Sequence, residues 1–333
     1  MQFPVILVYN KYAAVSGTIY YLSICFIGIP FITAYNIISS IFRGMGDSKS
    51  PMYFIAVACV SNIALDYILI GMLGLGAVGA ALGTTLSQTI SVLISIIVII
   101  KRKTGITLKL KDFKPHKKIM SGLLNIGIPI ALQDGFIQVS FIVITVIANQ
   151  RGLNDAAAVG IVEKIIGVLF LVPSSMTSAV SALSAQNIGA GKHDRARLTL
   201  LYAVIISVAW GTIAVIAMQY TAEPFIGLFS NNTDVILLGS QYMRGYVWDC
   251  ILAGIHFSFS GYFCAYGLSS ISFFHNSLSI VFVRIPLSYF ASKYFTNTLF
   301  PMGLASPSGS ALSVIICVIV FIWINKRHTK AKY

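Results

Sequence analysis

The chain has 333 residues, of which 57% are hydrophobic and only 10% are charged, and its mean hydropathy is +0.85. Soluble domains carry about a quarter charged residues, so this composition excludes a water-soluble globule. The apolar stretches are unbroken rather than alternating, which argues against a transmembrane β-barrel. The sequence therefore predicts an all-α integral membrane protein, a polytopic helix bundle.

Apolar runs of about 20 residues are long enough to span a bilayer as helices. Such runs between polar breaks predict nine spans, at about residues 17–42, 51–73, 77–100, 122–148, 156–185, 198–220, 236–267, 272–295 and 303–325. The first nine residues, MQFPVILVY, are apolar but too short to cross, and they resemble the end of a helix. They also lack the basic start and the small-residue cleavage site of a secretory signal.

Lys and Arg outnumber Asp and Glu by 23 to 10. Their distribution argues against a nucleic-acid partner, because they lie in short connections between apolar runs, where they attract anionic lipid headgroups. Seventeen basic residues fall on one side of the predicted spans and three, Lys11, Arg151 and Lys293, on the other. The positive-inside rule therefore predicts a multi-pass protein of the plasma (cytoplasmic) membrane whose C-terminus is cytoplasmic.

Residue types that carry enzymatic or metal chemistry are not grouped in the sequence. The five cysteines show no CxxC spacing, so neither a disulfide framework nor a zinc site is predicted. The five histidines are scattered, and no nucleophile or paired-carboxylate motif lies at the end of a span. We therefore expect no enzymatic activity and no cofactor.

A faint internal repeat runs through the sequence. NIALDYIL at 62–69 matches RIPLSYFA at 284–291 at an offset of 222, and GAAL at 79–82 matches GSAL at 309–312. The repeat predicts two pseudo-symmetric lobes: an incomplete N-lobe at 1–100, a basic cytoplasmic linker at 101–118 and a six-helix C-lobe at 119–333. About 100 residues of the second lobe, enough for three helices at 1.5 Å per residue, have no counterpart in the first.

Four segments of the sequence have distinctive motifs: FRGMGDSKSP at 42–51, GLGAVGAALGTTLSQ at 74–88, GIPIALQ at 127–133 and AQNIGAGKHDRA at 185–196. Together they resemble the multidrug and toxic compound extrusion (MATE) family, most of all its DinF-like prokaryotic branch. The resemblance implies a secondary active exporter that exchanges amphipathic organic cations for H⁺ or Na⁺ by alternating access. It also implies that residues 1–100 correspond to the fourth to sixth helices of the family, so that the first three are missing.

The first candidate site lies in the N-lobe. Asn62 and Asp66 are four residues apart and share one helix face, and an acid inside the bilayer is a functional candidate because burying its charge is costly. In the family that the chain resembles, the positions matching Asn62, Asp66 and Thr84 form the coupling-cation site, which makes Asp66 and Asn62 candidate Na⁺ ligands. That site includes an Asp on the first helix, which is absent here. A structural polar contact between helices is the alternative.

The C-lobe supplies four further candidates. Asp249 matches an acid on the tenth helix of the family, and its simplest partner is Arg284, as a structural ion pair or as part of a cleft site. A Glu that completes a cation site in another branch of the family is replaced here by Ile137. Asp134 and Gln138, again four residues apart, are expected either to line the substrate cleft or to form hydrogen bonds between helices.

Other polar and aromatic residues receive weaker assignments. Glu163 and Lys164 are adjacent and thus about 100° apart around a helix, so they are not natural partners. Either could snorkel or pair across the bundle, and no function beyond a role in the cleft is assigned to them. One span carries an aromatic set that could stack on a flat cation, although packing in the core is favoured. The set is Phe257, Phe259, Tyr262, Phe263 and Tyr266.

Two other functions stay open. A flippase for a lipid-linked oligosaccharide or peptidoglycan precursor shares this lobe architecture, but it is expected to have a strongly basic cleft, and intramembrane cations are few here. A non-functional truncated remnant is the second, because three missing helices would leave polar groups of the N-lobe uncovered in lipid.

The loop from Arg43 to Asp47 is predicted to be a tight cytoplasmic turn, with gating through ion pairs as the alternative.

Overall fold

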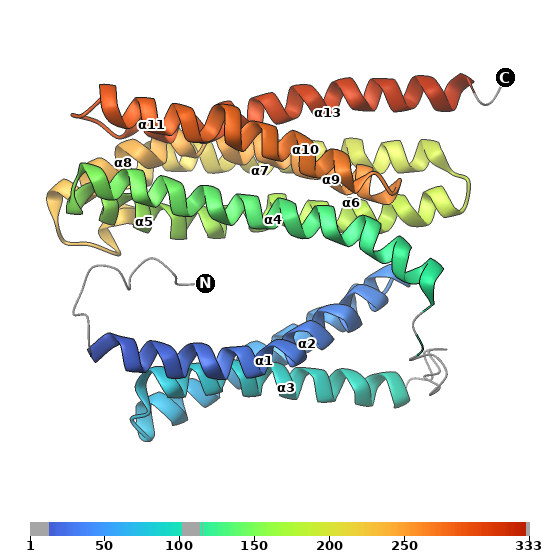
Figure 1. Cartoon of the computed structure of the whole chain (residues 1–333), viewed down its shortest axis with the longest axis horizontal. Helices are drawn as coiled ribbons and strands as arrows, with labels where there is room; N and C mark the ends of the chain where they lie inside the picture. The colour runs from blue at the N-terminus through green and yellow to red at the C-terminus, as the bar shows by residue number, and fades with distance from the viewer. Residues whose placement is uncertain (1–12, 102–113, 115, 331–333) are drawn as a thin grey trace. The chain divides into compact units, whose positions relative to one another are not determined.

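The computed structural model describes residues 13–101, 114 and 116–330, and these are almost entirely helical (Figure 1). The chain divides into two compact units, unit 1 (Met1–Pro115) and unit 2 (His116–Tyr333). The segment MQFPVILVY and most of the predicted linker at 101–118 lie outside the described residues.

The described residues of unit 1 form three long helices. Helices α1 (Ala13–Gly44) and α2 (Lys49–Asp66) both pack against α3 (Gly76–Lys101). Helix α2 continues directly into a π-helical segment, η2 (Tyr67–Met72). The apolar runs form helices because a helix satisfies its backbone hydrogen bonds within one segment, which lipid cannot do.

Unit 2 contains the remaining helices. In chain order they are α4 (Lys117–Arg151), α5 (Leu153–Leu169), α6 (Leu171–Gly189), α7 (His193–Gly227), α8 (Thr233–Tyr246), α9 (Asp249–Ala265), α10 (Ser269–Ser279), the π-helical segment η4 (Ile280–Arg284), α11 (Ile285–Tyr294), α12 (Phe300–Gly303) and α13 (Ala305–Lys330). Helix α9 lies in the interior, where it contacts α6, α7, α10 and α13, whereas α4 packs on α10 and α11.

The described residues contain seven helices long and apolar enough to cross a membrane, or eight if α5 and α6, which meet at a bend of 40°, form one span. These correspond to eight of the nine predicted spans. The exception is the prediction at 236–267, because the helix there is divided at Val247–Trp248 into α8 and α9. With 14 and 17 residues, neither half reaches the roughly 20 residues that a full span needs.

The predicted turn between α1 and α2 is confirmed. Gly46 has a φ of 87°, a conformation that glycine adopts without a steric penalty. The Oδ1 atom of Asp47 accepts hydrogen bonds from the backbone nitrogens of Lys49 and Ser50, both at 3.0 Å. These donors would otherwise lack partners at the start of α2, so the Asp47 side chain fixes where that helix begins.

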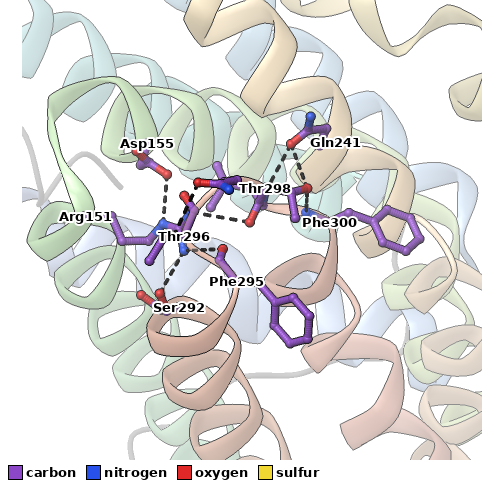
Figure 2. Close-up of polar contacts among 10 residues, drawn as sticks. Arg151, Asp155, Gln241, Ser292, Phe295, Thr296, Thr298 and Phe300 are labelled. Carbon is purple, nitrogen blue, oxygen red and sulfur yellow. Dashed lines mark hydrogen bonds and ion pairs between the residues drawn. The ribbon is translucent and has the colours of Figure 1, made fainter.

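Arg151, at the end of α4, holds together the turn that follows α11 (Figure 2). Its Nε atom lies 2.8 Å from Oδ1 of Asp155 on α5. Its Nη1 and Nη2 atoms donate to four backbone carbonyls at 2.9–3.4 Å, those of Ser292, Phe295, Thr296 and Thr298. Because the last carbonyls of a helix have no partner within it, this guanidinium satisfies the end of α11 and ties it to α4 and α5.

The order of helices repeats along the chain. An offset of 222 maps α1 onto residues 235–266, which α8 and α9 occupy, and maps α2 with η2 onto 271–294, which α10, η4 and α11 occupy. A π-helical segment ends the second span of unit 1 and lies within the corresponding span of unit 2. The three helices of unit 1 thus correspond, in order along the sequence, to α8 with α9, to α10 with η4 and α11, and to α13.

Candidate functional site

The interior of unit 2 holds a group of charged and phenolic side chains, which we call the Arg284 cluster: Arg284, Glu163, Asp249, Tyr242 and Tyr246. Arg284 is 9% exposed, Asp249 is 2% exposed and both tyrosines are 1% exposed, while Glu163 is half-buried. Burying a charge costs several kcal/mol unless it is paired or hydrogen-bonded. This concentration of charge in an apolar protein is therefore a candidate functional site.

Arg284, the last residue of η4, directs its guanidinium group at aromatic side chains. Its Nη2 atom donates a hydrogen bond of 2.8 Å to the hydroxyl of Tyr246. Its Cζ atom lies 4.7 Å from the centre of the Phe141 ring and 5.8 Å from that of the Tyr246 ring. An aromatic face attracts a cation, so the two rings partly replace the water that the guanidinium loses on burial.

Asp249, the first residue of α9, does not form the direct ion pair predicted with Arg284. The hydroxyl of Ser306 on α13 donates to Oδ2 of Asp249 at 2.7 Å, and Oδ1 is buried without a hydrogen-bond partner. The ion pairs among the described residues are Arg151–Asp155, Arg197–Asp194 and Arg244–Glu223. Arg284 forms its hydrogen bond with Tyr246 and Asp249 forms its hydrogen bond with Ser306. The charges of Arg284 and Asp249 interact only at longer range.

Glu163 is the member of the cluster to which the sequence assigned no function beyond a role in the cleft. Its Oε1 atom is buried without a hydrogen-bond partner, and the side chain lies beside Thr145 of α4 and within electrostatic range of Arg284. Lys164 is exposed, as expected for a neighbour about 100° further around the helix. When all three charged groups are ionised, two carboxylates face one guanidinium, so the cluster has a net negative charge.

The backbone around the Arg284 cluster is irregular in three places. Helix α5 gives way to α6 at Phe170, α8 gives way to α9 at Val247–Trp248, and η4 is π-helical. The indole nitrogen of Trp210 donates to the carbonyl of Leu169 at 2.9 Å, which satisfies an acceptor at the first break. Interrupted helices at membrane depth are tolerated where protein encloses them, and in transporters they commonly surround ion and substrate sites.

In unit 1, Asp66 is the last residue of α2, and its Oδ1 atom is buried without a hydrogen-bond partner. This oxygen faces Gly83 of α3 so closely that a side-chain carbon at position 83 would collide with it. The same carbon would stand 3.6 Å from Nδ2 of Asn62. Asn62 and Asp66 therefore approach one point on α3, as expected for two residues on one helix face.

The other neighbours of Asp66 differ from those that the family pattern implies. The hydroxyl of Thr84 donates to the carbonyl of Ala80 in its own helix at 3.0 Å, and no hydrogen bond among the described residues joins it to Asn62 or Asp66. Tyr21 and Cys25 of α1 interact with each other, and Tyr21 lies within electrostatic range of Asp66. The residues that surround Asp66 thus come from all three helices of unit 1.

Gly83, like the two α1 residues, was not singled out from the sequence. A signal for it existed, because Gly79 and Gly83 form a GxxxG pattern, which lets helix backbones approach closely in a membrane. A side-chain carbon at Gly79 would meet the backbone of Leu69 at 3.1 Å. Both glycines therefore mark the face of α3 that receives α2 and η2.

Asp134 and Gln138 lie on α4 and are both exposed, whereas Gln133 is buried. Neither Asp134 nor Gln138 has a hydrogen bond to another described side chain or backbone group. They belong to the surface of unit 2 and are not part of the Arg284 cluster. Their role in lining a substrate cleft stays a prediction.

The histidines are not all scattered in space, contrary to the impression that the sequence gives. His256 of α9 and His275 of α10 are buried with ring centres 5.6 Å apart. Among the described residues, no group of three or more His, Cys, Asp or Glu side chains could hold a metal ion. Three members of the aromatic set, Phe259, Tyr262 and Phe263, pack in an apolar core, as favoured from the sequence.

Known proteins resemble this chain in sequence and in fold. A family model described as MatE matches residues 129–290, and one described as lipid II flippase MurJ matches residues 9–152. The chain is 26% identical over 319 residues to the Probable multidrug resistance protein YoeA of Bacillus subtilis, covering 93% of this chain and 69% of that protein. It is 28% identical over 249 residues to the Multidrug export protein MepA of Staphylococcus saprophyticus, covering 74% and 54% respectively.

This chain thus spans between 54% and 69% of the length of these relatives. Solved structures share its fold. An outward-facing multidrug resistance MATE family transporter of the MOP superfamily superposes with a TM-score of 0.85 at 22% identity, covering 94% of this chain and 70% of that one. A MOP superfamily transporter from Pyrococcus furiosus gives a TM-score of 0.85 at 22% identity, with coverages of 95% and 70%. In its motifs, its helix order and these relatives, the chain is similar to the MATE family of membrane transporters.

Proposed function

We propose that this chain acts in secondary active multidrug efflux, exchanging amphipathic organic cations for H⁺ or Na⁺ by alternating access. The observation that carries the proposal is the buried Oδ1 atom of Asp66, held against Gly83 beside Asn62 without a hydrogen-bond partner. A carboxylate in that position gains from binding a proton or a sodium ion. Binding that favours one conformation over the other shifts the equilibrium between them.

Two features support a cationic, chemically varied substrate. The relatives YoeA and MepA bear the names of multidrug resistance and multidrug export proteins. The exposed Asp134 on α4 and the net negative charge of the Arg284 cluster favour positively charged ligands, and aromatic residues favour flat organic cations. The family and these relatives are transporters rather than enzymes.

The membrane assignment belongs to the same proposal. The excess of basic residues on one side of the spans supports insertion in the plasma membrane with the C-terminus in the cytoplasm. The basic connections would then contact anionic lipids of the inner leaflet, at about 1 kcal/mol for each Lys or Arg near the surface.

The decisive test is Asp66→Asn, which keeps the shape of the side chain but removes its charge. In a pump-deficient bacterium that produces the chain, we expect the variant to insert normally and to lose ethidium efflux. Asp194→Asn is the control, because Asp194 is 81% exposed and pairs only with Arg197 at 3.4 Å. Efflux by Asp66→Asn equal to that of the control would remove Asp66 from the mechanism.

The match to a lipid II flippase model over residues 9–152 supports one other function, the flipping of a lipid-linked oligosaccharide or peptidoglycan precursor. Such a substrate carries a pyrophosphate, which needs accessible cations. Of the intramembrane cations considered from the sequence, Arg284 is buried against aromatic rings, Arg244 pairs with Glu223 at 3.1 Å and Lys164 is exposed. Movement of a fluorescent polyprenyl-pyrophosphate reporter in proteoliposomes, without ethidium transport, would favour the flippase.

A further inference from the structure

Three helices of unit 2 turn polar residues toward their shared contact, which we call the polar seam. It consists of Asp249, His256 and Ser260 on α9, Ser272, His275 and Ser279 on α10, and Ser306, Ser310 and Ser313 on α13. On each helix the spacings are three, four or seven residues, which keep the side chains on one face. All nine residues are buried, the most exposed at 8%, although the protein around them is strongly apolar.

Hydrogen bonds connect the three helices along the seam. Ser306 donates to Asp249 across α13 and α9 at 2.7 Å, and the Oγ atom of Ser260 lies 3.0 Å from Nε2 of His275 across α9 and α10. The hydroxyl of Ser313 donates to the backbone carbonyl of His275 at 3.2 Å. Ser272 donates to the carbonyl of Ser260 at 3.3 Å. The bonds form two groups, Ser306 with Asp249 and Ser260 with Ser272, His275 and Ser313. His256 lies between the two groups along α9, with its ring centre 5.6 Å from that of His275.

The network leaves specific atoms without partners. The Oδ1 atom of Asp249 and the Nδ1 atoms of His256 and His275 are buried and accept or donate no hydrogen bond. His256 is 3% exposed and His275 is fully buried, and a buried polar atom without a partner costs about 1–3 kcal/mol. A purely structural network would be expected to satisfy these atoms, and each of them is chemically able to gain or lose a proton.

Imidazole and hydroxyl groups suit proton transfer because each both accepts and donates. A neutral imidazole can bind a proton at one nitrogen while the N–H bond at the other breaks, which leaves the ring neutral in its second tautomer. From Asp249 to Ser260 the seam follows α9 for about 16 Å at 1.5 Å per residue, roughly half of the 30 Å hydrocarbon layer. It can therefore connect the bilayer interior with one end of the helix.

Neighbouring charged groups limit how many protons the seam holds. Arg284 and His275 face His256, and Arg284, with Ser306 and Ser310, faces Asp249. Glu163 of α5 and Tyr242 and Tyr246 of α8 are also near Arg284. Toward the other end of α9, Cys264 lies beside Ser272, and Arg197 lies near Tyr262. Because positive charges repel one another beside a fixed guanidinium, the seam passes protons one at a time.

We propose that the polar seam is a proton path through unit 2, along which His256 and His275 relay protons to and from Asp249. The proposal rests on the proposed function, and it names H⁺ as the ion that unit 2 exchanges. The only chemical step in the seam is the transfer of a proton from one oxygen or nitrogen atom to another.

The first test needs no substrate. The whole chain, labelled with ¹⁵N-histidine in lipid nanodiscs, is examined by NMR for the tautomers of the two buried rings. A relay requires both tautomers of His275, so we expect two populations in exchange, reduced to one by Ser260→Ala. Ser258→Ala is the matched control, because Ser258 is also buried on α9 but donates to Gly254 at 2.7 Å, outside the seam. A single tautomer in the wild type and both variants would overturn the proposal.

The second test measures protons directly. Proteoliposomes containing the pH dye pyranine receive tetraphenylphosphonium, and protons moved are compared with tetraphenylphosphonium transported. We expect His256→Gln and His275→Gln to lower this ratio about tenfold or more, and Ser258→Ala to leave it unchanged. An unchanged ratio in both histidine variants would contradict the proton path. If the wild type transports no tetraphenylphosphonium, the proposed function fails, and the tautomer experiment still decides whether the seam relays protons.

Discussion

Gly83→Ala tests the Asp66 site without removing any charged group. The added methyl carbon would collide with Oδ1 of Asp66 and would stand 3.2 Å from its Cγ. Because the backbones of α2 and α3 are packed together, the carboxyl group must rotate away from α3. Overpacking of this kind costs about 1–3 kcal/mol, and it falls on the side chain that we propose binds the coupling ion.

That free energy corresponds to a roughly 5- to 150-fold weaker affinity for the coupling ion. We therefore expect Gly83→Ala to need a correspondingly higher concentration of H⁺ or Na⁺ for half-maximal transport. The assay is ethidium efflux in inverted membrane vesicles, measured over a series of pH values and of sodium concentrations. Because the variant keeps the Asp66 carboxyl group, we expect its efflux rate to recover in part when the concentration of H⁺ or Na⁺ is saturating.

Gly17→Ala is the matched control in the same unit. Its added carbon would meet only the Cβ atom of Ala77, at an ordinary distance of 3.9 Å. Replacing a helical glycine by alanine stabilises a helix by about 1 kcal/mol, so weaker helices cannot explain a loss seen only in Gly83→Ala. Equal ion dependence of the two variants would refute the coupling role. A lower melting temperature of Gly83→Ala with unchanged ion dependence would favour a structural contact.

Three further predictions concern unit 2, and each is measured as thermal unfolding of purified protein. Arg151→Lys replaces five donors by three, so at least two partners shown in Figure 2 lose their bonds and stability falls by about 1–3 kcal/mol; an unchanged melting temperature would contradict this. Tyr246→Phe removes a hydrogen bond to a buried cation, worth about 1.5–3 kcal/mol, and should destabilise unless another hydroxyl replaces it. Gly211→Ala places a carbon 2.8 Å from the backbone nitrogen of Ile251 and should destabilise by about 1–3 kcal/mol, whereas Gly167→Ala, with open space around it, should not.

The contacts in the Arg284 cluster bear on whether Asp249 is a structural residue or a proton-binding residue. If Asp249 were part of a static ion pair, its loss would chiefly destabilise the protein. Asp249 instead has one oxygen bound to Ser306 and one oxygen unpaired, while Arg284 binds Tyr246. We therefore expect the carboxyl group to remain available to protons, which connects the cluster to the polar seam.

The amino-acid sequence by itself determined which segments form long apolar helices, with one exception, and which residues share a helix face. Backbone groups in lipid must find partners within their own segment, so long apolar runs specify helices without reference to their neighbours. The helical period likewise placed Asn62 and Asp66 together, which the shared contact with Gly83 bears out. The division of the predicted span at 236–267 was missed because no proline and no long polar loop separates its two halves in the sequence.

Only the tertiary structure decided which polar side chains meet. The periodicity of a helix does not set its rotation or its crossing angle against another helix, and those two quantities choose the partners. Arg284 therefore binds Tyr246 rather than the predicted Asp249, Glu163 joins the same cluster from α5, and His256 meets His275 from the next helix. Each pairing joins side chains on different helices, and packing between helices is a property of the folded bundle as a whole.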